Sequence, residues 1–138
     1  MRVSTMIRPA VFGLLFLGGV AAAEGPAAAP HLVALDAIEQ GQWQLREVGG
    51  TSVRALCVAD PRVLIQLEHG RAQCSRFIVA NTANSAIVNY TCPGSGHGRT
   101  TITVETGRLF KLQTQGIADG APFDMSYEAR RIGACGSH

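Results

Sequence analysis

The segment Phe123 to Arg131, FDMSYEARR, alternates apolar and polar side chains more regularly than any other part of the chain. One face of this alternation carries four apolar side chains, Phe123, Met125, Tyr127 and Ala129. The other face carries four polar ones, Asp124, Ser126, Glu128 and Arg130. A period of two predicts a β-strand with one face on a core and the other in water. We therefore expect the fold to be built from strands of this kind.

The same kind of pattern continues toward the N-terminus. Asp119-Gly120 is a strong hairpin signal, and Leu109–Gln115 should pair with Arg99–Thr106 across a turn at Gly107. Alternation or β-branched content predicts four earlier strands, Gln42–Val48, Ser52–Val58, Arg76–Ala80 and Ser85–Cys92. We therefore expect a mainly β fold of about seven antiparallel strands. Such a sheet would curl into a barrel-like shape or fold over on itself to hide its edges.

One short helix is expected between Cys57 and Cys74. Asp60 is a good N-cap residue, and Pro61 follows it at the first helical position. Apolar residues then recur at helical spacing until Gly70, which is typical of a helix end. A second segment, Leu32–Gln40, has a helix-like composition and precedes the first strand.

The first 23 residues have the pattern of a cleavable signal peptide. Arg2 and Arg8 form a positive region, Ala10–Val20 is an uncharged apolar run, and Ala21-Ala22-Ala23 supplies small residues for cleavage. The alternatives are an N-terminal membrane anchor or a buried helix, but the apolar run is too short to span a bilayer. The first cysteine after the apolar run is Cys57, so a lipoprotein anchor at this point is excluded. We therefore expect a periplasmic or secreted bacterial protein without a stable membrane anchor after cleavage.

The rest of the chain divides into a spacer and one domain. Residues 24–34 are rich in Ala and Pro and are expected to be a disordered spacer, and 35–138 should form a single β domain. The full chain carries 12 basic and 10 acidic residues, and loss of Arg2 and Arg8 with the signal peptide makes the mature chain neutral. A neutral domain without a basic run is a poor nucleic-acid binder, so no such partner is expected.

Four cysteines lie in the mature region: Cys57, Cys74, Cys92 and Cys135. An even number of cysteines in a small exported domain favours disulfides over a zinc site, which would need close pairs. Three pairings are open, and spacing alone does not choose between them. We favour Cys57–Cys74 with Cys92–Cys135, because the first would close the helical excursion and the second would tie the middle of the sheet to its last strand.

These residues together resemble a known family. The resemblance lies in the order of these motifs along the chain: Gly41-Gln42-Trp43 at the first strand, Cys57 and Cys74 around the helix, Tyr90-Thr91-Cys92-Pro93-Gly94, Met125-Ser126-Tyr127, and Arg131-Ile132-Gly133-Ala134-Cys135. This order resembles the family called domain of unknown function 3617, small exported proteins of Gram-negative bacteria. The resemblance covers about Leu35 to Cys135. It implies an envelope location and a β-rich fold, and it implies no activity or catalytic residue.

Two sets of residues are candidates for binding. Large side chains would line an apolar ligand cavity if the sheet curls around one, although they would equally fill a core: Trp43, Phe77, Phe110, Phe123, Met125 and Tyr127. A Gly-rich loop would cradle an anion, although such loops are also common turns: Gly94, Ser95, Gly96, His97 and Arg99. The loop lacks the Gly-Lys-Ser/Thr end of a P-loop and the spacing of a nucleophile elbow.

No catalytic residue, metal site or cofactor is predicted, because the histidines show no ligand spacing and the acidic residues are scattered. We expect a non-enzymatic binding module for a small apolar ligand or an envelope protein partner. One alternative is a small periplasmic hydrolase or metal-dependent enzyme whose site forms only in the fold. Another is an inhibitor or chaperone-like accessory protein. A cavity lined by the aromatic side chains would favour the binding module. His97 close to a carboxylate would favour the enzyme, and an exposed apolar patch would favour the accessory protein.

Overall fold

The computed structural model describes residues 19, 22 and 31–136. The expected signal peptide, apart from Gly19 and Ala22, and the spacer up to residue 30 lie outside the described residues. Two helical segments are present, α1 (Val33–Asp36) and the 3-10 helix η1 (Pro61–His69). The strands are β1 (Gly41–Glu47), β2 (Val53–Val58), β3 (Ser75–Asn81), β4 (Ser85–Cys92), β5 (Gly96–Thr106), β6 (Leu109–Ala118) and β7 (Ala121–Gly133).

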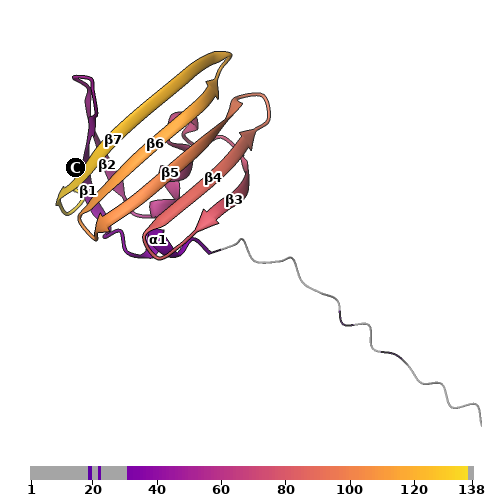
Figure 1. The fold of residues 1–138 in the computed structure, drawn as a ribbon, viewed down its shortest axis with the longest axis horizontal. Coiled ribbons are helices and arrows are strands. Elements are labelled where there is room, and N and C mark those ends of the chain that lie inside the picture. Colours follow the sequence, from indigo (N-terminus) through magenta and orange to yellow (C-terminus); the bar gives the residue numbers. More distant parts are fainter. Residues whose placement is uncertain (1–18, 20–21, 23–30, 137–138) are drawn as a thin grey trace, which may run out of the picture.

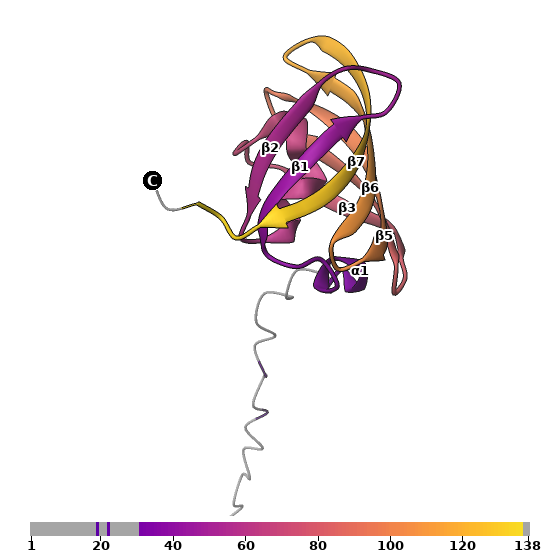
Figure 2. The same ribbon diagram turned by 90° about the vertical axis from the view of Figure 1, so that its left-hand side faces the viewer.

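The seven strands form one antiparallel sheet in the order β2-β1-β7-β6-β5-β4-β3 (Figure 1). This confirms the mainly β fold and the strand count expected from the alternation. All neighbours are consecutive hairpins except β1 and β7, where Leu45 pairs with Ala129. The sheet curves around η1 but is not closed into a barrel, so β2 and β3 remain as its two edges (Figure 2).

The hydrophobic core lies on the concave face of the sheet. Trp43 and Phe110 are fully buried, and their ring centroids lie 4.8 Å apart. Leu64 and Ile65 of η1 and Leu35 of α1 cover this face from the other side. Burial of each large apolar side chain contributes about 1.5–3 kcal/mol. The predicted alternation in the last strand is confirmed, because Tyr127 and Ala129 are buried while Asp124 and Arg130 are exposed.

Polar contacts hold η1 across the concave face at three places. Arg54 of the edge strand β2 donates to Glu68 at 2.9 Å, and Arg76 of the opposite edge strand β3 donates to Gln66 at 2.9 Å. Between them, the Thr100 hydroxyl of β5 donates to the Ile65 carbonyl at 2.6 Å. The helical segment thus spans the open side of the sheet from one edge to the other.

The predicted capping of this segment is confirmed in its details. The Asp60 carboxylate accepts from the Arg62 backbone N–H at 3.0 Å, and Pro61 follows the cap. The segment is a 3-10 helix with a kink at Gln66 (φ −120°, ψ 44°). The Gln66 amide donates to the carbonyls of Gly70 and Ala72 at 3.0 and 2.8 Å, which satisfies groups that a regular helix end would leave unpaired.

The expected disulfide pairing is wrong. The bonds join Cys57 to Cys135 and Cys74 to Cys92. Strand register explains both. In the β3–β4 hairpin Ser75 pairs with Thr91, which puts the two flanking cysteines opposite each other with Cα atoms 4.1 Å apart. At the opposite edge of the sheet, Gln42 of β1 pairs with Cys57 of β2 on one side and with Gly133 of β7 on the other. This arrangement places the Cα atoms of Cys57 and Cys135 5.4 Å apart.

The folded domain begins before the expected boundary at residue 35. Leu32 and Ala34 are buried, and Val33–Asp36 forms α1. Asn81, at the end of β3, fixes this segment with two hydrogen bonds. Its amide donates to the His31 carbonyl at 2.7 Å and its side-chain oxygen accepts from the Val33 N–H at 3.0 Å. The short helix is therefore attached to the edge of the sheet.

Candidate ligand-binding site

A pocket of about 570 Å³ lies between α1, η1 and the inner face of β3 and β4. Its floor is aliphatic, formed by Leu32, Leu35, Ile65, Ile78 and Val88. Its rim carries five ionisable side chains, His31, Asp36, Asp60, Arg62 and Arg76. Pro61 and Cys74 complete the wall. The pocket therefore combines an apolar interior with a charged entrance, which is the usual composition of small-molecule sites.

The floor of the pocket follows from alternation in the edge hairpin. Arg76 and Ile78 are two residues apart and share the inner face of β3, where Ile78 pairs with Val88 of β4, and Cys74 directly precedes this strand. Val88 is buried and Ile78 is only partly buried, because β3 has no further strand beside it. The apolar surface that remains open at this edge is the surface of the pocket.

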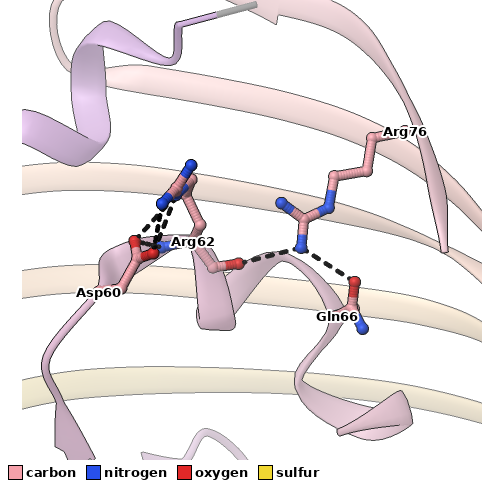
Figure 3. A network of polar contacts seen from close by, with 4 residues as sticks. All are labelled: Asp60, Arg62, Gln66 and Arg76. Atoms are coloured by element: carbon pink, nitrogen blue, oxygen red, sulfur yellow. Dashed lines mark hydrogen bonds and ion pairs between the residues drawn. The ribbon is translucent and has the colours of Figure 1, made fainter. Parts of the chain in front are cut away.

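Asp60 and Arg62 form one side of the rim and satisfy each other (Figure 3). Arg62 Nε and Nη2 lie 2.9 and 2.7 Å from Asp60 Oδ2, and Nε lies 3.1 Å from Oδ1. These side-chain hydrogen bonds, followed by the backbone bond of the cap, lower the pKa of Asp60. The same contacts raise the pKa of Arg62. Asp60 is therefore a fixed anion whose charge is already matched.

Arg76 has different partners. Its Nη2 donates to Gln66 Oε1 at 2.9 Å and lies 3.5 Å from the Arg62 carbonyl, so both acceptors are neutral (Figure 3). Among the described residues, no carboxylate lies within 4.0 Å of its guanidinium nitrogens. Partial burial and then the charge of Arg62 lower the pKa of Arg76, while Asp60 opposes this effect. Arg76 is thus a cation at the pocket mouth whose charge lacks a close partner.

The opposite side of the rim belongs to α1. There His31 Nε2 lies 2.6 Å from Asp36 Oδ2, and both side chains are largely exposed. The entrance is therefore charged unevenly. The two arginines lie on the η1 and β3 side, and Asp36 lies on the α1 side.

The structure does not bring the predicted aromatic set together around a cavity. Trp43, Phe110 and Tyr127 are buried in the core, and Met125 packs against it. Phe123 is partly buried beside His69, with ring centroids 5.8 Å apart. Phe77 is 69% exposed, because its position in β3 opposite Asn89 places it on the outer face of the sheet. None of the set lines the pocket described above.

The predicted anion-binding loop is divided between a turn and a strand. Gly94 and Ser95 lie in a tight turn, where the Ser95 N–H donates to the Cys92 carbonyl at 2.9 Å. Gly96, His97 and Arg99 belong to β5. The turn backbone is therefore partly occupied by the protein's own hydrogen bonds.

The side chains of His97 and Arg99 point to the outer face of the sheet. There they line a shallow depression of about 660 Å³ together with Asn89, Gln115 and Asp124. Among the described residues no hydrogen bond or ion pair links His97 to Asp124. The structure thus puts a histidine and a carboxylate in one open depression without joining them.

His69 has a clear place in the packing. Its Nε2 lies 2.9 Å from the Ile117 carbonyl, which only accepts, so in the neutral ring this nitrogen carries the proton. Nδ1 then accepts from the Tyr90 hydroxyl at 2.9 Å. Burial raises the pKa of Tyr90. Together these bonds fix the C-terminal end of η1 to β4 and β6.

The described part of the chain holds no group of three His, Cys, Asp or Glu side chains arranged to bind a metal. Within the same residues, no helix is long and apolar enough to cross a membrane. Comparison with family models, curated proteins and solved structures finds no match to this chain. The pocket and its rim are therefore the observations from which a function is argued.

None of the residues of this pocket was among the ligand-binding candidates predicted from the sequence, where Cys74 was expected only in a disulfide and Asp60 only as a helix cap. A usable signal was present for two of them, because Arg76 and Ile78 lie on one face of the predicted strand Arg76–Ala80. Nothing in the sequence placed Leu32 and Leu35 or Asp60 and Arg62 against that face, since these contacts join segments that only the fold brings together.

Proposed function

We propose that this protein is an exported, non-enzymatic binding module that holds a small, largely apolar ligand in the pocket between α1, η1 and β3–β4. The observation that carries the proposal is the open aliphatic floor of a pocket of about 570 Å³. Pockets for small molecules occupy about 300–1,000 Å³ and are mostly apolar with a few placed polar groups. The floor supplies the apolar contact, and the rim supplies the polar groups.

Two observations support a periplasmic or secreted location. Both disulfides join residues of the mature region, and disulfides persist mainly in oxidising compartments. The N-terminal 23 residues have the charge, apolar run and small residues of a signal peptide. Membership of the domain of unknown function 3617 family is part of the same proposal and rests on the order of cysteines and strand motifs.

The chemistry of the rim on its η1 and β3 side favours binding over catalysis. A guanidinium is not deprotonated in proteins, and Asp60 is held as an anion by Arg62, so neither group is suited to moving a proton near neutral pH. The Cys74 sulfur at the wall is in a disulfide and is not a nucleophile. These groups orient a ligand instead. Exposed Phe77 and Val79 on the outer face of β3 favour a protein partner, but nothing described shows what would cover them.

The test is binding of a fluorescent apolar probe, N-phenyl-naphthylamine, to the mature chain. We expect the probe to bind, and Ile78→Asp, which puts a charge on the pocket floor, to weaken binding at least tenfold. The matched control is Phe77→Ser, the adjacent residue on the outer face of the same strand. Circular dichroism shows whether both variants fold. Equal loss of binding in the two variants, or none in either, would contradict the proposed site.

A further inference from the structure

The charges around the pocket are not balanced in space. Asp60 is saturated by the three side-chain contacts and one backbone bond that it accepts from Arg62. That pair needs no further partner. Arg76 is the remaining cation on this side of the rim, and its guanidinium is folded back onto η1 by neutral acceptors (Figure 3).

The unused donors of Arg76 lie on two of its three guanidinium nitrogens. Both of its hydrogen bonds leave from Nη2, so Nε and Nη1 have no acceptor among the described residues. A guanidinium presents five N–H donors in a plane, and each side-by-side pair includes Nη2, as Nε and Nη2 of Arg62 do toward Asp60. Because Nη2 of Arg76 is already bonded, a carboxylate binds this residue through single charge-assisted hydrogen bonds from Nη1 or Nε. The residue is at the exposed mouth of the pocket, so an incoming group reaches these donors without moving the protein.

We propose that the ligand of this pocket is an amphipathic monoanion, an alkyl chain with a single carboxylate, whose head binds Arg76 while its chain lies on the aliphatic floor. This inference rests on the proposed function above. Arg76 and Ile78 are two residues apart on the same face of β3, which spaces head and chain contacts by about 7 Å. The head and the first methylene groups of such a chain fit that spacing.

The other charged groups that face the pocket restrict which charged ligands fit it. Asp36, paired with His31 on the α1 side, disfavours a second anionic group at the far end of a ligand. Arg62, although matched by Asp60, disfavours a cationic head near Arg76. A fatty acid satisfies both conditions, whereas a dicarboxylate or an alkylamine does not.

The experiment compares three ligands with the same chain, decanoate, decanol and decylamine, as competitors of the bound fluorescent probe near neutral pH. We expect decanoate to compete about tenfold better than decanol, a modest factor because Arg76 is open to solvent. Decylamine is expected to compete least. In Arg76→Gln decanoate should fall to the level of decanol, while decanol should be unchanged.

Two further variants separate charge from packing. Arg76→Lys keeps the charge but cannot donate to Gln66 and to a carboxylate in the same planar geometry, so it should retain part of the preference for decanoate. Arg99→Gln, on the outer face of β5, is the matched control and should behave as the wild type. Equal competition by all three ligands in the wild type, or an equal loss for decanol in Arg76→Gln, would overturn the carboxylate inference alone. Failure of the probe and all three ligands to bind would overturn the proposed function itself.

Discussion

Gly98, in the middle of β5, shows how single residues decide the packing of this sheet. A Cβ atom at this position would lie 2.4 Å from the Tyr90 hydroxyl, which is too close for any side chain. Gly96 is similar, since a Cβ there would lie against the Ile117 carbonyl. These glycines come from the Gly-rich stretch that suggested an anion-binding loop. The structure gives them a packing reason, which is to leave room for Tyr90 and for the His69 ring that bonds to it.

Replacement of Gly98 by alanine is therefore expected to destabilise the fold by about 1–3 kcal/mol, the usual cost of overpacking. The new methyl group would push Tyr90 away from His69 and release the end of η1. Urea unfolding followed by the fluorescence of Trp43, the only tryptophan, measures the change. Thr103→Ala, an exposed position on the same strand, is the control and should stay within about 0.5 kcal/mol. Equal midpoints for the two variants would show that Tyr90 relaxes freely.

At the scale of elements, the strands were the most predictable part. Alternation placed Ser85–Cys92 at its observed bounds, and Asp119-Gly120 adopts the positive φ angles of 49° and 80° that its hairpin turn requires. Strands β5, β6 and β7 extend beyond the predicted ends, because pairing with a long neighbour continues where side-chain alternation has already faded. The local sequence pattern determines whether a strand forms, and the neighbouring strand determines how long it is.

The element that the sequence described least well is η1. Its cap and its end were predicted, but its 3-10 geometry depends on hydrogen bonds from Thr100, Arg54 and Arg76, which lie on three different strands. The candidate pocket was missed for the same reason. Its walls come from α1, η1 and β3, and no sequence pattern reports that these segments meet.

The cap of η1 gives a prediction with a defined pH dependence. Asp60→Ala removes the acceptor of the Arg62 N–H and should cost about 0.5–2 kcal/mol, whereas Asp60→Asn keeps an acceptor and should cost less. The pKa of Asp60 is lowered by its Arg62 hydrogen bonds, so its charge stabilises the fold above the ordinary carboxyl pKa of about 3.9. That contribution is lost as pH falls through the lowered value.

The measurement is urea unfolding of the wild type and Asp60→Asn between neutral pH and pH of about 3. The difference in unfolding free energy between the two proteins should shrink toward acid pH, where Asp60 loses its charge. It should also shrink in high salt, because the Asp60–Arg62 ion pair is exposed and salt screens it. A difference that grows on acidification would contradict the assigned sign.

At the scale of the whole molecule, the two disulfides stabilise the open sheet to different extents. The Cys57–Cys135 bond spans 78 residues and the Cys74–Cys92 bond spans 18. The loop-entropy relation gives them about 4.5 and 3 kcal/mol. Paired alanine variants that remove one bond at a time should therefore differ in unfolding free energy, with Cys57→Ala/Cys135→Ala the less stable. The reverse order would mean that the unfolded chain keeps structure between β2 and β7.

The predicted hairpin brings Cys74 close to Cys92 but does not give the native register. A hairpin symmetric about the predicted turn at residues 81–84 would set Cys74 opposite Thr91, one residue short of Cys92, whereas in the observed register, which contains a shift between Ile78 and Ala80, Ser75 pairs with Thr91 and the two cysteines meet. The preference for neighbours along the chain went wrong because it ignored register. Strand pairing, and not proximity in sequence, determines which sulfurs meet.

The nested arrangement of these bonds has a consequence for the order in which the molecule is made. A chain that enters an oxidising compartment N-terminus first presents Cys57 and Cys74 together, long before Cys135 emerges. If these two thiols oxidise first, they form a Cys57–Cys74 bond, which the finished fold does not contain. A chain oxidised in that order reaches the native pairing only by thiol–disulfide exchange after the last strand has arrived, so we expect a host that supplies an oxidant without an isomerase to accumulate chains with mispaired disulfides.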